Sequence, residues 1–212
     1  MIPQGFSYHA GYLDDSRQRA VLAAVRAVVA HSPFYTPTMP RSGKPLSVRM
    51  TNCGPLGWMT DKAGGYRYQP THPETGRPWP PMPAEILEVW RELANYPVEP
   101  EACLINYYAG ASRLGSHQDA DESDTAAPVV SISLGDDAVF HVGGLRRADP
   151  KHRLTLHSGD VVVLGGASRL AYHGVDRILP GTSDLLPDGG RINLTLRRVT
   201  LPAGAGRPPS VG

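Results

Sequence analysis

A histidine and a carboxylate stand two residues apart near the middle of the chain, at His117 and Asp119. They follow an apolar run, and in an extended segment residues i and i+2 point to the same face. An imidazole and a carboxylate are two of the three ligands in the facial triad that holds non-haem Fe(II) with open positions for chemistry. This interpretation requires a distant histidine as the third ligand. By itself, such a pair is a weak signal, because two solvent-exposed polar residues are the commoner explanation.

His173 meets this requirement, since it follows an apolar, strand-like segment well beyond Asp119. A strand there would bring its side chain from the far side of a β-barrel. A histidine after an apolar run is also a common core or surface residue. We predict a metal site formed by His117, Asp119 and His173, and look to the last strand for support.

That support comes from residues 191–197, Arg-Ile-Asn-Leu-Thr-Leu-Arg. A period of two sends their polar side chains to one face and their apolar side chains to the other, as in a barrel strand with a polar interior. Two buried arginines need anions, and a guanidinium suits bidentate capture of a carboxylate. We predict that Arg191 binds the distal carboxylate of a diacid. Arg197 would lie nearer the metal, beside either the other carboxylate or the aspartate ligand. Asn106 and Tyr108, on one strand face, could hydrogen-bond the same diacid.

The elements that position these residues change character along the chain. Helical periodicity predicts one helix from Asp14 or Asp15 through Ala30 and a second with Pro83 in its first turn. Beyond residue 101, short β-type runs are separated by Gly, Asp or Pro. These runs are expected at residues 102–108, 129–134, 138–142, 154–156, 161–164, 170–173 and 191–199. The pattern predicts an α+β, mainly β fold: a double-stranded β-helix (jelly roll) with the N-terminal helices packed outside.

The length of 212 residues favours one domain. We predict that residues 1–200 form it, with a lid region and helix at about 46–100 and the jelly-roll core at 101–199. Residues 201–212 have little apolar content, which predicts a disordered tail.

Composition narrows the functional classes. Lys plus Arg total 21 and Asp plus Glu total 20, so any site for a polyanion must be local. Cys53 and Cys103 lack CxxC spacing, which argues against a disulfide scaffold or a structural zinc site. Neither a signal peptide nor a membrane-spanning run is recognisable, and we expect a soluble cytoplasmic protein.

An aromatic cluster precedes the second predicted helix. Trp58, Tyr66 and Tyr68 lie in a Gly-rich segment with Arg67 between the tyrosines. Such a cluster could form a stacking platform for a planar base. The alternative is that these side chains only pack a loop onto the domain.

Taken together, these motifs resemble the AlkB family of Fe(II)- and 2-oxoglutarate-dependent nucleic-acid dealkylases, from about Ser47 through Val199. The motifs that carry the resemblance are Thr51-Asn52-Cys53-Gly54, Leu56-Gly57-Trp58, Gly65-Tyr66-Arg67-Tyr68, Ala102-Cys103-Leu104-Ile105-Asn106, His117-Gln118-Asp119, Tyr172-His173-Gly174 and the strand from Arg191 to Arg197.

The resemblance assigns roles to individual residues. It implies that the Fe(II) ligands are His117, Asp119 and His173, with Arg197 beside them in the catalytic centre. It implies that 2-oxoglutarate is surrounded by Asn106, Tyr108, Arg191, Asn193 and Arg197. Substrate contacts are implied at Trp58 and Tyr66 as walls of the base site, at Asp121 facing the base, and at Arg147 near the bound strand.

The activity implied is oxidative demethylation of N-alkylated bases, such as 1-methyladenine and 3-methylcytosine, in DNA or RNA. The alkyl carbon is hydroxylated with O₂ and 2-oxoglutarate, and aldehyde, succinate and CO₂ are released. These lesions are cationic and have lost Watson–Crick pairing, so they are cheaper to flip out and suit an aromatic face. We expect single-stranded DNA or RNA as the partner and a monomer without an obligate protein partner. The expected strand-binding patch is Arg146, Arg147, Lys151, His152 and Arg153.

Departures from the family pattern leave the substrate range open. Leu164 and Ala171 occupy positions where relatives have larger aromatic side chains, and Gly189-Gly190 suggests a longer loop before the last strand. One alternative is an oxygenase of the same chemistry that acts on tRNA, a protein or a small molecule. A second is a non-catalytic nucleic-acid-binding module, whose expected signature, a substituted metal ligand or arginine, is not found.

Overall fold

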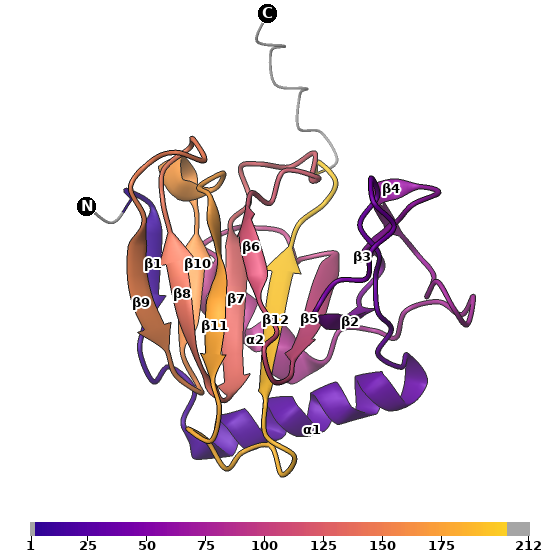
Figure 1. Cartoon of the computed structure of the whole chain (residues 1–212), viewed down its shortest axis with the longest axis horizontal. Helices are drawn as coiled ribbons and strands as arrows, with labels where there is room; N and C mark the ends of the chain where they lie inside the picture. The colour runs from indigo at the N-terminus through magenta and orange to yellow at the C-terminus, as the bar shows by residue number, and fades with distance from the viewer. Residues whose placement is uncertain (1–2, 203–212) are drawn as a thin grey trace, which may run out of the picture.

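Two antiparallel β-sheets packed face to face dominate the computed structural model, which describes residues 3–202 (Figure 1). The larger sheet has six strands in the order β1-β10-β7-β12-β5-β2, and the smaller has four in the order β6-β11-β8-β9. Their bounds are β1 (Phe6–His9), β2 (Arg49–Cys53), β5 (Ala102–Tyr108), β6 (Leu114–His117), β7 (Val129–Gly135), β8 (Asp137–Val142), β9 (His152–Leu156), β10 (Val161–Leu164), β11 (His173–Leu179) and β12 (Arg191–Arg197). This arrangement confirms the predicted jelly-roll core.

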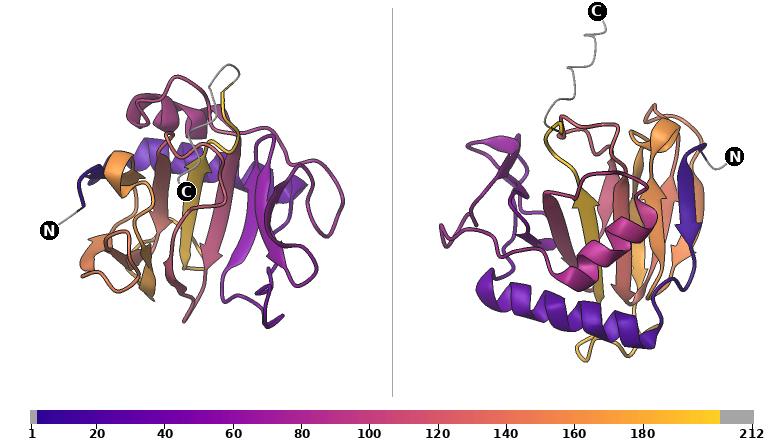
Figure 2. Two further views of the ribbon diagram at one scale, coloured as in Figure 1. Left: turned by 90° about the horizontal axis from the view of Figure 1, so that it is seen from above. Right: turned by 180° about the vertical axis from the view of Figure 1, so that it is seen from behind.

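Two helices cover the outer face of the larger sheet, as the view from behind shows (Figure 2). Helix α1 (Asp15–His31) begins where the Asp14 carboxylate accepts a hydrogen bond of 2.8 Å from the Arg17 amide, a regular N-cap. Helix α2 (Ala84–Leu93) follows Pro83, which occupies the N-cap position. Both helices bury their apolar sides in one cluster with the outward residues of β12. The prediction of helices outside the barrel is therefore confirmed.

Strand β12 lies at the centre of the larger sheet, between β7 and β5. Its apolar residues, Ile192, Leu194 and Leu196, pack beneath the helices. Its polar residues point to the space between the two sheets, where Arg191 faces Tyr108 of β5 in the strand register. Because both faces are covered, all seven residues of β12 are buried. The alternation read from the sequence therefore describes a polar interior and an apolar exterior.

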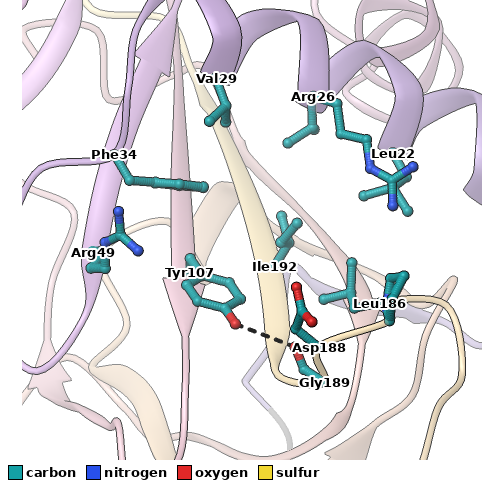
Figure 3. Close-up of a pocket in the computed structure, with 12 residues that line it drawn as sticks. Leu22, Arg26, Val29, Phe34, Arg49, Tyr107, Leu186, Asp188, Gly189 and Ile192 are labelled. Atoms are coloured by element: carbon teal, nitrogen blue, oxygen red, sulfur yellow. Dashed lines mark hydrogen bonds between the residues drawn. The ribbon is translucent and has the colours of Figure 1, made fainter.

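A surface cavity of about 360 Å³ lies on the helix side of β12 (Figure 3). Its lining includes Val29, Phe34, Tyr107 and Ile192, and the Tyr107 hydroxyl donates to the Gly189 carbonyl at 3.3 Å. Ile192 is one of the outward residues of β12, so this cavity is separated by the sheet from the predicted metal ligands.

Three features differ from or extend the expectation. The strand predicted at residues 170–173 is wrong: a short 3₁₀ helix (Gly166–Ser168) and a turn at Leu170 come first, residues 171–172 belong to no strand, and β11 begins only at His173. Strands β1 and β2 form the edges of the larger sheet, which therefore includes residues before the predicted core range 101–199. The predicted tail, 201–212, lies almost wholly outside the described residues.

A separate hairpin, β3 (Gly57–Asp61) and β4 (Gly65–Gln69), stands beyond the β2 edge of the larger sheet (Figure 1). It contains the aromatic cluster. Register places Trp58 opposite Tyr68 and Thr60 opposite Tyr66, so the three aromatic side chains share one face.

Candidate active site

The three predicted metal ligands come together between the sheets. His117 ends β6, His173 begins β11, and these residues are directly paired in the register. The ligand atoms of His117, Asp119 and His173 all lie within 4.8 Å of one another, and this is the one such group found among residues 3–202. Asp119 Oδ1 is 3.9 Å from His117 Nε2, and Asp119 Oδ2 is 3.6 Å from His173 Nε2. Two nitrogens and a carboxylate at this spacing could hold a divalent metal ion.

Each histidine is oriented by its own backbone. His117 Nδ1 lies 2.9 Å from the Gly115 carbonyl oxygen, and His173 Nδ1 lies 2.9 Å from that of Ala171. A carbonyl only accepts, so both Nδ1 atoms carry the proton and both Nε2 atoms keep a free lone pair. Gly174 permits this pairing, because a Cβ there would lie 2.6 Å from the Leu114 carbonyl oxygen.

Electrostatics favour the metal-binding protonation states. Burial, reinforced by the neighbouring His117, lowers the pKa of His173 to about 4. Burial alone would raise the pKa of Asp119, but Arg197 and the two histidines hold it well below its usual range. At neutral pH the site therefore presents a neutral His173 and an ionised Asp119, as metal ligation requires.

Arg197 is held by protein carboxylates. Its Nη2 donates to Asp119 Oδ1 at 2.8 Å, and its Nε lies 3.5 Å from Glu122 Oε1. Burial would lower the pKa of Arg197, but Asp119, Tyr68 and Glu122 raise it far above its usual value. Of the two positions predicted for Arg197, the structure shows the one beside Asp119.

Arg191 occupies the opposite end of β12 and has no carboxylate partner among the described residues. Its Nη2 donates to Ser133 Oγ at 2.9 Å, and its guanidinium lies 5.3 Å from the centre of the Tyr108 ring. Burial lowers the pKa of Arg191. Beside it, the Asn193 amide donates to Ser131 Oγ at 2.7 Å. This end of the strand thus carries a buried positive charge without a protein anion.

Unsatisfied polar atoms on the inner faces test whether a metal ion and a diacid fit. Within residues 3–202, the buried atoms without a hydrogen-bond partner include Asn106 Oδ1, Asp119 Oδ2, Arg191 Nε, Arg191 Nη1 and Arg197 Nη1. Buried polar groups are normally paired, so such a set indicates missing ligands. The guanidinium nitrogens suit the carboxylates of a diacid, and Asp119 Oδ2 suits a metal ion. The residues present therefore fit Fe(II) and 2-oxoglutarate.

The hairpin brings its aromatic rings to the ligand-bearing segment. The rings of Trp58 and Tyr66 stack at a centroid distance of 5.7 Å with 24° between their planes. Tyr66 is 55% exposed. Trp58 Nε1 donates to Asp121 Oδ2 at 2.7 Å, and the Asn52 side chain binds both the N–H and the carbonyl of Trp58. Because the two rings already stack on each other, they present one aromatic surface rather than two walls with a gap between them.

The predicted strand-binding residues lie in the loop before β9, at Arg146, Arg147 and Lys151, and on β9 itself, at His152 and Arg153. Arg147 donates to the Ser116 carbonyl at 2.7 Å, and its guanidinium lies 4.9 Å from the Tyr172 ring centre. Arg147 is thereby placed next to the strand that carries His117. Arg153 pairs with Asp176 at 2.8 Å on the outer face of the smaller sheet.

Several residues of the site were not identified from the sequence. Glu122 and Arg169 form a buried ion pair at 3.1 Å, and Arg169 Nη1 also donates to the Asp119 carbonyl at 2.7 Å. A signal existed, because the acids at 119, 121, 122 and 124 are too dense to be buried without cations. The sequence also contained a signal for Ser131 and Ser133. They are the polar positions, two residues apart, in the apolar run of β7.

Comparison with known proteins places this site in a family. The model of the 2OG-Fe(II) oxygenase superfamily matches residues 5–197. The chain is 55% identical over 197 residues to an alpha-ketoglutarate-dependent dioxygenase AlkB homolog of Caulobacter vibrioides, covering 93% of this chain and 89% of that protein. It is 48% identical over 178 residues to the alpha-ketoglutarate-dependent dioxygenase AlkB of Escherichia coli, covering 82% and 81%.

The chain belongs to the AlkB family of 2OG-Fe(II) oxygenases. A solved structure titled "The structure of OsALKBH1" agrees with it at a TM-score of 0.73 and 33% identity, covering 92% of this chain and 98% of that one. The predicted family, fold and cofactor pair are therefore confirmed. As an AlkB family member, the protein is an Fe(II)- and 2-oxoglutarate-dependent dioxygenase. Among residues 3–202 there is no helix long and apolar enough to cross a membrane.

Proposed function

We propose that this protein removes alkyl groups oxidatively from N-alkylated bases, such as 1-methyladenine and 3-methylcytosine, in single-stranded DNA or RNA. The observation that carries the proposal is the position of the exposed Trp58–Tyr66 surface, which is hydrogen-bonded through Asp121 to the segment that bears Asp119. An aromatic face beside an acidic side chain suits a cationic base. We further propose that the protein acts as a monomer in the cytoplasm.

In this proposal the chain supplies binding and orientation. His117, Asp119 and His173 would hold Fe(II). Arg191, with Tyr108, Asn106 and Asn193 near it, would hold the distal part of 2-oxoglutarate, and Arg197 keeps Asp119 ionised and oriented. Bound iron with 2-oxoglutarate supplies the oxidation of the alkyl carbon by O₂.

The substrate is positioned by the hairpin and the segment after β6. The exposed Trp58–Tyr66 surface would stack the flipped base, and base–aromatic stacking contributes about 1–3 kcal/mol per base. Asp121 would favour the positive charge of the lesion, and Arg147 would bind the strand backbone. Flipping is easiest for a lesion that has already lost its pairing. The near-neutral net charge of +1 fits modest, salt-sensitive binding of short single strands.

The test uses protein loaded anaerobically with Fe(II) and 2-oxoglutarate, mixed with a single-stranded oligonucleotide carrying one 1-methyladenine and then exposed to air. Mass spectrometry of the oligonucleotide is expected to show loss of one methyl group, with an equal amount of succinate. His117→Ala is the control and should form neither product. Succinate without demethylation would contradict the substrate assignment and favour tRNA, a protein or a small molecule.

A further inference from the structure

The hairpin that carries the aromatic surface is connected to Asp119 by a chain of side chains that is half-buried at Tyr68 and buried beyond it. The Tyr68 hydroxyl of β4 donates a short hydrogen bond to Glu122 Oε1. The same oxygen lies 3.5 Å from Arg197 Nε, and Arg197 Nη2 donates to Asp119 Oδ1 at 2.8 Å. The chain therefore runs from the hairpin to a metal ligand in three contacts.

Glu122 is the junction of this chain. Its side chain is 1% exposed, and its other carboxylate oxygen accepts from Arg169 Nη2 at 3.1 Å. Arg169 is itself fixed, because it also donates to the carbonyls of Asp119 and Ala127, each at 2.7 Å. Burial raises the pKa of Tyr68 well above its usual value, so its hydroxyl keeps the proton that it donates.

A second link joins the same two parts. Trp58 of β3 donates to Asp121, so both strands of the hairpin are bonded to consecutive residues of the segment after Asp119. The two links differ in environment: the Trp58–Asp121 bond is exposed, whereas the Tyr68–Glu122 bond is partly buried and ends on a Glu122 side chain that is itself buried. A hydrogen bond shielded from water is electrostatically stronger than an exposed one, so the link through Glu122 holds the hairpin more tightly.

We propose that Tyr68 and Glu122 are positioning residues that couple the hairpin to Asp119, so that a base stacked on the hairpin and a metal ion held by Asp119 stabilise each other. Neither residue is required to touch the base or the iron. Coupling of this kind is reciprocal, so loading the metal site must also order the hairpin. The reciprocal effect needs no nucleic acid and no turnover.

The test is amide hydrogen exchange of residues 57–69 in protein with and without anaerobic Fe(II) and 2-oxoglutarate. In wild-type protein, loading is expected to slow exchange roughly 10-fold, the lower end for one hydrogen bond to a charged group. Tyr68→Phe removes the hydroxyl and keeps the ring, and loading should then slow exchange less than about 2-fold.

Tyr96→Phe is the matched control, because the Tyr96 hydroxyl donates to Asp124 at 2.7 Å in the same acidic segment and has no contact with the hairpin or Arg197 in the described structure. It should keep the wild-type protection. Equal protection by loading in Tyr68→Phe and Tyr96→Phe would overturn the proposal, and so would equal loosening of the hairpin in the loaded and unloaded forms of Tyr68→Phe. Glu122→Gln, a second variant that keeps an acceptor for Tyr68 but loses the charge facing Arg197, should also lose the protection.

A second readout rests on the proposed function. In Tyr68→Phe, the succinate formed per demethylated base should rise several-fold above the value for Tyr96→Phe. An unchanged ratio in a variant that has also kept its exchange protection would overturn the coupling. Absence of demethylation in wild-type protein, with exchange protection retained, would instead reject the nucleic-acid substrate and leave the coupling standing.

Discussion

Arg191 and Arg197 stand at opposite ends of one strand and are both buried, yet their charges are balanced differently. Arg197 is paired with Asp119 and Glu122, which raise its pKa. Arg191 has a serine hydroxyl and an aromatic ring for neighbours, and burial lowers its pKa. A buried charge without a counter-ion costs folding free energy. The difference indicates that the Arg197 end is completed by the protein and the Arg191 end by a ligand.

The largest expected loss of activity and stability is at the Arg197 end of β12, whose charges are balanced by the protein. Asp119→Ala removes a metal ligand and leaves Arg197 with Glu122 alone, so turnover should fall to background. Breaking a buried pair in this way should lower the free energy of unfolding by up to about 3–5 kcal/mol. Urea unfolding of the metal-free protein measures this, and Asp119→Asn, which keeps the side-chain shape, is the control. Unchanged stability in Asp119→Ala would contradict the conclusion that the protein itself balances the charge of Arg197.

The next largest effect is expected at the Arg191 end of β12, which lacks a protein anion. Arg191→Met should weaken 2-oxoglutarate binding by about 2–5 kcal/mol, at least about 30-fold in Kd. Because Arg191 has no protein carboxylate to lose, the ligand-free variant should be as stable as wild type or more stable. Calorimetric titration and urea unfolding test the two parts. A marked loss of stability without loss of affinity would show that Arg191 is structural.

A smaller effect is expected from Trp58, and it should distinguish binding of the base from binding of 2-oxoglutarate. Trp58 is bonded to the segment at the Arg197 end, so Trp58→Ala should reduce kcat/KM for the methylated oligonucleotide by about 1–3 kcal/mol, the range for one stacked base. The affinity for 2-oxoglutarate and the succinate formed without oligonucleotide should not change. Steady-state assays of demethylation and of succinate formation without oligonucleotide test this prediction. An equal loss of activity in both reactions would contradict the stacking role of Trp58.

The last prediction concerns stability alone, through the pH dependence of the metal-free protein. The pKa of His173 is lowered to about 4, so as pH falls below the ordinary value of about 6.5 the unfolded chain takes up a proton that the folded chain refuses. Stability should therefore decline between about pH 6.5 and 4. His173→Asn should show a shallower decline in urea unfolding over this range, and identical slopes would contradict the assignment.

Sequence periodicity was sufficient to identify most of the fold and the inner polar face of β12, because alternation and burial follow from local chemistry. It did not reveal the role of Glu122 or Arg169, whose pairing depends on segments brought together only by folding. It also placed a strand at residues 170–173, where an apolar composition cannot distinguish a strand from a packed turn. The stacking of Trp58 on Tyr66 likewise depends on the register of a hairpin that the sequence did not predict.

Both candidate iron-binding histidines donate Nδ1 to the carbonyl two residues before them. The backbone of one tripeptide, Gly-Ser-His or Ala-Tyr-His, thus sets the tautomer of each histidine. The tautomer depends on no other side chain. The loops between residues 120 and 170 can then change in length or in charge without changing which nitrogen of each histidine faces the metal. In evolutionary terms, substrate choice can drift while the oxidising centre stays the same.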